Sequence, residues 1–157
     1  MSAEAIAIAA DHAGFPLKEE LVGELKARGF EVLDLGTHSS DSVDYPDFAD
    51  KLADAIGDGR AKRGVLICGT GIGISIAANR HHGIRAALCH DETTARLARE
   101  HNDANVLALG GRLTSPEVAK KCLAMFLATP FGGGRHERRV AKLDRRANHM
   151  PARSFVR

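Results

Sequence analysis

Residues 64–79 read GVLICGTGIGISIAAN, and this stretch decides the fold. The first five residues form a short apolar run, as expected for a strand that is covered on both faces of a sheet. A glycine-rich turn follows, Gly69-Thr70-Gly71-Ile72-Gly73, and Ile74–Asn79 then continue as a short helix. Strand, tight turn and helix in this order predict one unit of a parallel α/β fold, with the turn at the carboxyl end of its strand.

The same alternation of short apolar runs and helix-like segments extends over the rest of the chain. Four more strands are predicted at Ala5–Ala9, Val32–Leu35, Ala86–Cys89 and Val106–Leu109. Helices are predicted to start at Pro16, Pro46, Asp91 and Ser115-Pro116, and to cover the polar segment Arg135–Arg146. The pattern predicts a three-layer, doubly wound α/β fold (Rossmann-like) with a five-stranded parallel sheet and a C-terminal helix.

Composition is that of a globular protein with a single core. The chain has 157 residues, 27% charged and 44% hydrophobic, which is enough for one core without disulfides or structural metal. We expect one domain over residues 1–146 and a basic tail at 147–157. The three cysteines, Cys68, Cys89 and Cys122, form no C-x-x-C pair. This spacing argues against a disulfide framework and a zinc ribbon, and favours a reducing, cytoplasmic location.

Charge and hydropathy argue against two classes of partner. The formal net charge is +2 and 4% of the residues are aromatic, so a nucleic-acid surface with base-stacking platforms is not expected. No apolar stretch is long enough to span a bilayer, and the first residues lack the pattern of a secretory signal. We therefore expect a small-molecule ligand and neither a nucleic-acid nor a membrane partner.

In an open parallel sheet, ligands bind beyond the carboxyl ends of the strands, near the point where the strand order reverses. Candidate catalytic and binding residues are therefore expected in the loops at that edge. These loops are Asp11-His12-Ala13-Gly14, Gly36–Tyr45, Gly69–Gly73, His90-Asp91 and Gly110-Gly111-Arg112.

Cys68 ends its strand directly before the glycine-rich turn and the helix that follows it. The free backbone N–H groups there would stabilise a thiolate, a phosphate or an enediolate oxygen. The alternative is a buried and inert thiol, which is common for a free cysteine, and position alone leaves both open. Cys89, in an apolar strand, and Cys122, on an apolar helix face, are assigned to the core.

The glycine-rich turn fits neither of two common nucleotide-binding motifs. G-x-G-x-x-G would need glycine where Ile74 stands, and the motif belongs after the first strand. A P-loop would need Gly-Lys-Ser/Thr at its end, whereas Gly73 is followed by Ile74-Ser75. A turn that holds an anion or an oxyanion remains.

Two polar pairs lie next to predicted strands. Asp11-His12 follows the first strand, where the aspartate could serve catalysis or cap a helix. His101-Asn102 precedes the fifth strand, where a histidine could exchange protons and an asparagine could bind a hydroxyl group. No histidine has metal-motif spacing, since His136-Glu137 lacks a second histidine at Val140, and we expect no metal.

Arg135 and Arg139 are four residues apart, so a helix places both on one face. Guanidinium groups bind phosphate oxygens through paired hydrogen bonds, and Arg112 after the fifth strand could add a third group. The alternative is a solvated basic face, to which we assign Arg138 and the basic residues that follow it.

Taken together, five motifs resemble the type B ribose-5-phosphate isomerase family, in order and in spacing. The resemblance covers about Ile6 to Arg146. The wider family also includes galactose-6-phosphate and allose-6-phosphate isomerases. The motifs are Asp11-His12-Ala13-Gly14, Asp44-Tyr45-Pro46, Cys68–Gly73 with Ala77-Ala78-Asn79, His101–Asn105, and Gly133-Gly134-Arg135-His136.

The resemblance implies aldose–ketose isomerisation of a sugar phosphate, D-ribose 5-phosphate to D-ribulose 5-phosphate in the pentose phosphate pathway. The reaction would need no metal and no cofactor. A base would take the proton from C2 of the sugar and return it to C1 through a cis-enediolate. Members of the family are dimers or dimers of dimers, so a homodimer or a dimer of dimers with active sites shared between subunits is expected.

The resemblance also implies a role for each candidate. Cys68 would be the base, Thr70 and the amides of the turn would hold the oxyanion, and His101 with Asp11 would help to open the sugar ring. Tyr45 and Asn102 would bind sugar hydroxyls, and His12 with three arginines would bind the phosphate. The implied substrate-binding set is Asp11, His12, Tyr45, Gly69, Thr70, Gly71, Ile72, Gly73, Asn102, Arg112, Arg135 and Arg139.

Some relatives use a glutamate in place of the cysteine, at the position of Ile74 here. No carboxylate occurs between Arg63 and Asn79, so this chain belongs to the cysteine type. The alternatives are an allose-6-phosphate or galactose-6-phosphate isomerase and a non-catalytic protein that binds a sugar phosphate. A dinucleotide-dependent oxidoreductase is a more distant alternative, because the third glycine of its motif is missing.

Overall fold

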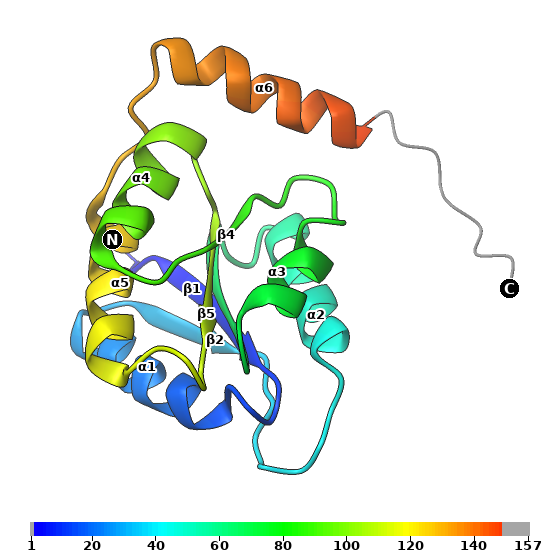
Figure 1. Cartoon of the computed structure of the whole chain (residues 1–157), viewed down its shortest axis with the longest axis vertical. Coiled ribbons are helices and arrows are strands. Elements are labelled where there is room, and N and C mark those ends of the chain that lie inside the picture. Colours follow the sequence, from blue (N-terminus) through cyan, green and yellow to red (C-terminus); the bar gives the residue numbers. More distant parts are fainter. Residues whose placement is uncertain (1, 149–157) are drawn as a thin grey trace, which may run out of the picture.

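The computed structural model describes residues 2–148, with side chains through residue 145. Five strands form one parallel sheet in the order β2-β1-β3-β5-β4 (Figure 1). The predicted five-stranded parallel sheet is therefore confirmed. The strands are β1 (Ala5–Ala10), β2 (Glu31–Asp34), β3 (Arg63–Cys68), β4 (Ala86–Leu88) and β5 (Val106–Gly110).

Helices cover both faces of the sheet, which gives the predicted three layers. One face carries α1 (Phe15–Ala27), α4 (Glu92–Asn102) and α5 (Pro116–Ala128). The other face carries α2 (Tyr45–Gly57) and α3 (Ile72–Ala78). The C-terminal helix α6 (Arg135–Asn148) lies across one end of the molecule and contacts α4 (Figure 1).

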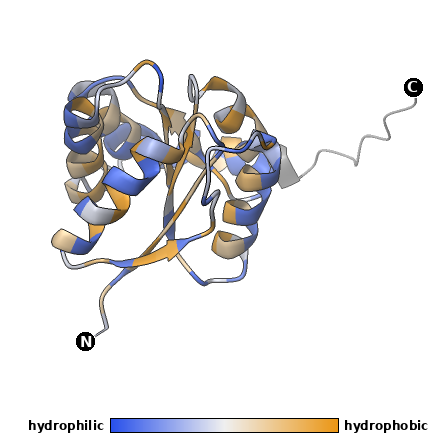
Figure 2. Cartoon of the chain, turned by 90° about the horizontal axis from the view of Figure 1, so that it is seen from below, coloured by the Kyte–Doolittle hydropathy of each residue, from blue (hydrophilic) through white to orange (hydrophobic). Residues whose placement is uncertain are grey.

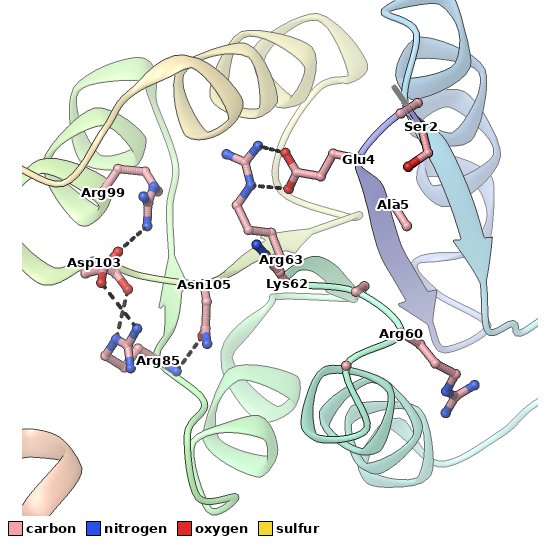
Figure 3. Close-up of a pocket in the computed structure, with 13 residues that line it drawn as sticks. Ser2, Glu4, Ala5, Arg60, Lys62, Arg63, Arg85, Arg99, Asp103 and Asn105 are labelled. Carbon is pink, nitrogen blue, oxygen red and sulfur yellow. Dashed lines mark hydrogen bonds and ion pairs between the residues drawn. The ribbon is translucent and has the colours of Figure 1, made fainter.

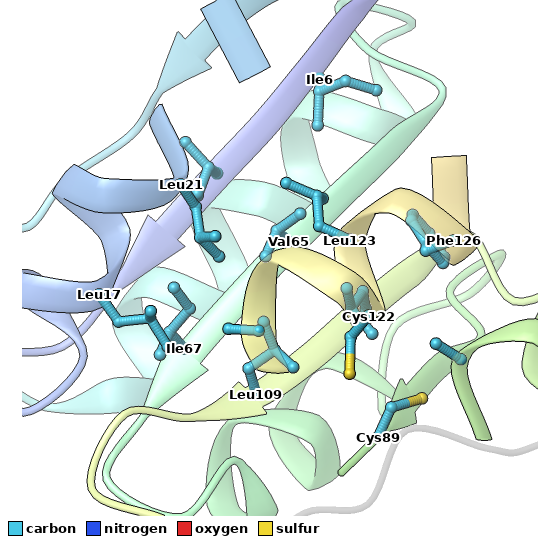
Figure 4. Close-up of a cluster of buried hydrophobic side chains, with 14 of the residues drawn as sticks. Ile6, Leu17, Leu21, Val65, Ile67, Cys89, Leu109, Cys122, Leu123 and Phe126 are labelled. Carbon is cyan, nitrogen blue, oxygen red and sulfur yellow. The ribbon is translucent and has the colours of Figure 1, made fainter. Parts of the chain in front are cut away.

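Two apolar cores hold the layers together, one on each face of the sheet. In α1, leucines at helical spacing pack against the first face, as expected for an amphipathic helix. Figure 2 shows hydrophobic residues along the strands and hydrophilic residues on the outer sides of the helices. The core on the α1 side includes Leu17, Leu21, Ile67, Leu109, Leu123 and Phe126 (Figure 4).

The two edge strands differ from the expectation that all strands are covered on both faces. Every residue of β2 and β4 retains some exposed surface, whereas the central strands β1, β3 and β5 are almost wholly buried. The predicted strands at these edges also end one residue late, because β2 stops at Asp34 and β4 at Leu88. Edge strands lack a neighbour on one side, so fewer ladder hydrogen bonds and less packing define where they end.

The strand order reverses between β1 and β3. The chain leaves β1 into α1 on one face and leaves β3 into α3 on the other, which opens a crevice between the two loops. The crevice lies at the carboxyl edge of the sheet, where Cys68 pairs with Gly110 of β5.

Helix α6 continues to Asn148, two residues past the predicted domain boundary at residue 146. It is held through the buried Val140 and an ion pair between Arg85 Nη1 and Asp144 Oδ1 at 3.2 Å. The rest of the predicted basic tail, residues 149–157, lies outside the described residues. Within residues 2–148, no helix combines the length and the apolar character needed to cross a bilayer.

Candidate active site

Cys68 lies at the carboxyl end of β3, in the middle of the sheet, and its side chain is 4% exposed. Its Sγ accepts a hydrogen bond from the backbone N–H of Gly71 at 3.2 Å. Gly71 has a φ of 78°, in the left-handed region, and glycine adopts this conformation without a steric penalty. The glycine-rich turn therefore gives the sulfur a fixed hydrogen-bond donor.

The loops after β1, β3 and β5 pack closely beside Cys68, with backbone against backbone. A Cβ on Gly110 would lie 2.7 Å from the carbonyl carbon of Thr70, and a Cβ on Gly14 would overlap the carbonyl oxygen of Ile67. The backbone N–H of Gly111 donates to the carbonyl of Cys68 at 2.8 Å. Glycine at these positions lets the loops after β1, β3 and β5 pack into one surface.

Arg112 extends along this surface from the loop after β5. Its backbone N–H donates to the carbonyl of Gly69 at 3.0 Å, and a Cβ on Gly69 would come within 3.2 Å of its Nη1. The guanidinium group therefore lies against the glycine-rich turn, close to Cys68. A positive charge at this place suits a phosphorylated substrate.

Asp11 and His12 form the loop after β1. The Asp11 side chain is 6% exposed, and its Oδ1 accepts the backbone N–H of Gly14 at 3.0 Å. His12 is half-buried, and its Nδ1 accepts the backbone N–H of Val43 at 3.1 Å. Asp11 thus closes the turn that leads into α1.

Tyr45 reaches the same surface from the start of α2. A Cβ on Gly73 would lie 2.6 Å from Cζ of the Tyr45 ring and 3.0 Å from its hydroxyl oxygen. Tyr45 as a whole is 40% exposed, so this part of the surface is open to solvent. The structure thus brings together Asp11, His12, Tyr45, Cys68, Gly69, Thr70, Gly71, Ile72, Gly73 and Arg112.

Substituting Gly73→Ala is expected to raise KM for a sugar phosphate about tenfold, because the new methyl group displaces the Tyr45 ring and weakens one hydrogen bond. Steady-state kinetics with thermal unfolding of the same variant checks this. Gly23→Ala is the matched control, since nothing lies within 4 Å of that position in α1. It should leave KM unchanged and stabilise the helix by about 0.5–1 kcal/mol. An unaltered KM in Gly73→Ala would exclude Tyr45 from the binding surface.

The remaining candidates lie at the other edge of the sheet. Helix α4 starts at the carboxyl edge after β4 and runs back, so His101 and Asn102 at its end lie near the amino ends of the strands. Arg135 and Arg139 follow on α6, which packs on that end of α4. One chain therefore carries two separate groups of candidate residues, one with Cys68 and one with His101.

The second group is organised around two stacked histidines. The rings of His101 and His136 are 4.3 Å apart between centroids and 14° from parallel. Loss of water around the stacked ring lowers the pKa of His136, and the neighbouring His101, Arg135 and Arg139 add to the effect. The carbonyl of Glu100 accepts the backbone N–H of Gly132 at 2.9 Å, which fixes the segment leading into α6.

A hollow of about 860 Å³ lies at the amino edge of the sheet, away from Cys68 (Figure 3). Its walls are ion pairs, since Arg63 donates to both carboxylate oxygens of Glu4, at 2.8 and 2.6 Å, while Arg85 and Arg99 both reach Asp103. The hydrogen bonds from Arg63 hold the pKa of Glu4 below its ordinary value. The arginines are also bonded to backbone carbonyls, so we assign this hollow to the packing of the amino edge rather than to chemistry.

The other two cysteines belong to the core, as predicted. Cys89 and Cys122 are 1% and 0% exposed, and burial raises the pKa of each thiol to about 11 (Figure 4). Both are therefore protonated near neutral pH and cannot act as bases. Among the described residues, no three His, Cys, Asp or Glu side chains gather in a metal-binding arrangement.

Two contacts near the site were not predicted from the sequence. The bond from Val43 to His12 is made by the backbone, so no residue type indicates it. The ion pair between the buried Lys18 and the partly exposed Asp34 did leave a signal, because Asp34 is a charged residue in a predicted strand that is otherwise apolar. A lysine beside Leu17 and an aspartate inside the predicted strand Val32–Leu35 could have been matched as partners.

Known proteins share both the sequence and the fold of this chain. A model of the ribose/galactose isomerase family matches residues 6–143. The chain is 50% identical over 135 residues to ribose-5-phosphate isomerase B of Escherichia coli, covering 86% of this chain and 91% of that protein.

Solved structures agree with the sequence match. Ribose-5-phosphate isomerase B of Clostridium thermocellum superimposes with a TM-score of 0.90 at 51% identity, covering 92% of this chain and 97% of that one. The Thermotoga maritima structure gives 0.89 at 56% identity, with 90% and 98% covered. On the family match and these identities, the chain belongs to the ribose/galactose isomerase family.

Proposed function

We propose that the chain is an aldose–ketose isomerase that interconverts D-ribose 5-phosphate and D-ribulose 5-phosphate. The observation that carries the proposal is Cys68, a nearly buried sulfur beside a backbone donor at the point where the strand order reverses. A protein that only binds a sugar phosphate has no need of a nucleophilic atom at this place. The names of the relatives described above support ribose 5-phosphate as the substrate.

In the proposed mechanism, the Cys68 thiolate removes the proton from C2 of the open-chain aldose and returns it to C1. The hydroxyl proton moves from O2 to O1 in the same sequence, so substrate and product are isomers and no redox partner is needed. Negative charge develops on oxygen in the enediolate, and Thr70 with the backbone amides of the glycine-rich turn stabilises it. His101 and Asp11 assist ring opening before this step.

A complete site then requires two subunits. Cys68 and His101 lie at opposite edges of one sheet, so the His101 group of one copy has to meet the Cys68 group of another. We infer a homodimer, or a dimer of such dimers, in which each site combines the two groups from different chains. Tyr45 and Asn102 would bind sugar hydroxyls from the two sides.

The phosphate group of the substrate would be held by His12, Arg112, Arg135 and Arg139. The guanidinium groups of Arg135 and Arg139 are exposed on one face of α6 and have no ion-pair partner among the described residues. Guanidinium groups match phosphate oxygens through paired hydrogen bonds. The sugar ring would then extend from this anchor toward Cys68.

Arg139→Ala is expected to raise KM for the sugar phosphate by about 10- to 100-fold, the size of one lost charge-assisted hydrogen bond, with a smaller change in kcat. Arg138→Ala removes the same charge from the neighbouring position of the helix and serves as the control. It should leave KM unchanged, because Arg138 belongs to the solvated face. Equal effects of the two substitutions would mean that only the net charge of α6 matters.

The substrate is tested by assaying the purified protein in EDTA with D-ribose 5-phosphate, allose 6-phosphate and galactose 6-phosphate side by side. We expect conversion of the pentose phosphate with the highest kcat/KM. Preference for a hexose phosphate would keep the mechanism and change the substrate, as the name of the matching family allows. Tight binding without turnover of any of the three would favour a sugar-phosphate sensor.

A further inference from the structure

Lys18 has no exposed surface, and its side chain is among the largest fully buried ones in the described part of the chain. From the first turn of α1 its Nζ donates to both carboxylate oxygens of Asp34, at 2.9 and 2.7 Å, and to Glu19 at 2.9 Å. The ammonium group also lies 5.5 Å from the centroid of the Phe15 ring. A charged group loses favourable contacts with water when it is buried, and an ion pair mainly offsets this cost. The Lys18–Asp34 pair is therefore expected to stabilise the fold little more than apolar side chains at the same positions would.

Asp34 also binds the loop between β2 and α2, and so links Lys18 to that loop. The same Oδ1 that binds Lys18 also accepts the backbone N–H of Gly36 at 3.0 Å. Gly36 and Thr37 are in turn bonded to the backbone of Ala10, at 2.7 and 2.8 Å. The near end of this loop is therefore fastened both to α1 and to the last residue of β1.

The far end of the same loop reaches His12. The N–H of Val43 donates to His12 Nδ1, whereas residues 38–42 between the two ends are exposed. A backbone amide can only donate, so Nδ1 carries no proton and the neutral ring has its proton on Nε2. The orientation of the His12 ring, and the proton that Nε2 offers to a ligand, thus depend on where the loop holds Val43.

We propose that the Lys18–Asp34 ion pair is a positioning pair for His12. Lys18 is tied to the His12 loop, because its backbone N–H donates to the carbonyl of Gly14, and Asp34 is tied to the loop that carries Val43. The pair therefore fixes the position of the two loops relative to each other. In this position His12 offers its Nε2 proton to an oxygen of the substrate phosphate. Only the statement that the acceptor is a phosphate oxygen of the substrate rests on the proposed function.

The test uses Lys18→Met, which keeps the length of the side chain, and the double variant Lys18→Met/Asp34→Asn. The double variant leaves only the exposed carboxylate of Glu19 without its partner. Nitrogen-15 NMR of the His12 ring, assigned by comparison with His12→Gln, reports which ring nitrogen carries the proton. We expect the proton on Nε2 in the parental protein and a mixture of both forms in each variant. KM for D-ribose 5-phosphate should rise about tenfold in both, as for one weakened hydrogen bond, with kcat nearly constant.

Thermal unfolding separates positioning from stability. The double variant should regain most of the melting temperature that Lys18→Met loses, because neutral replacements of a buried pair are tolerated, yet its KM should stay raised. Arg28→Met is the control, because it removes the exposed Arg28–Glu24 pair at the far end of α1. It should change neither the protonation of the His12 ring nor KM. The proposal would be overturned if the double variant kept the KM of the unsubstituted protein and the same His12 protonation. It would also be overturned if His12 of the unsubstituted protein carried its proton on Nδ1. The NMR result stands even if the protein turns out not to isomerise the pentose phosphate.

Discussion

Two inactive variants, Cys68→Ala and His101→Ala, should regain activity when their subunits are combined in one dimer. The reason is geometric: Cys68 ends β3 at one edge of the sheet, and His101 ends α4 at the other. In a mixed dimer with shared sites, one site carries both substitutions and the other carries neither. Purified mixed dimers should therefore show about half of the parental activity, and a random mixture of subunits about a quarter.

Co-expression with two different affinity tags, followed by two purification steps, yields the mixed dimer for assay. The matched control combines Cys68→Ala with Asp11→Ala. Those two residues lie in the same group, so every site in that mixed dimer has one defect and no activity should return. Lack of recovery in the first combination would mean that a site is completed within one chain.

Cys68→Ala alone should lower kcat by about 10²-fold or more, the usual contribution of a positioned base, and leave KM nearly unchanged. The turn keeps its donors in this variant, because they are backbone groups of Gly71 and its neighbours. Substrate should therefore still bind while the proton at C2 is no longer removed. Rapid kinetics together with calorimetric titration of the sugar phosphate separates these two effects.

Cys122→Ala is the control for loss of a thiol. This residue is fully buried in the core and its thiol, with a pKa of about 11, stays protonated near neutral pH. The variant should be less stable because a buried side chain is shortened, with kcat unchanged. Near-parental turnover by Cys68→Ala would remove the cysteine from the mechanism.

Much of the fold follows from local patterns in the chain. The apolar runs predict all five strands, and Asp91 and Ser115 begin α4 and α5 with the side-chain caps expected of them. The strands at the sheet edges stop at Asp34 and Leu88, one residue before the predicted ends, because an edge strand has a neighbour on one side only. Strand order is set by packing between distant segments, which no local pattern encodes.

Part of the candidate site could likewise be predicted from the sequence, and part could not. Residues in loops after strands, such as Asp11 and Cys68, could be placed together because parallel strands end at one edge. The separate position of His101 follows from helix length, since 11 residues of α4 extend about 16 Å. What sequence alone could not predict are the contacts made by backbone groups, above all the bond from Val43 to His12.

The most direct test of the central claim is proton NMR of D-ribose 5-phosphate in D₂O with EDTA and the parental protein. The account predicts that D-ribulose 5-phosphate appears and that the C2 proton of the remaining aldose is replaced by deuterium, because the thiol of Cys68 exchanges with solvent. The same sample with Cys68→Ala should show neither change. Absence of both conversion and exchange with the parental protein, or equal exchange with the Cys68→Ala variant, would contradict isomerisation through an enediolate formed by Cys68.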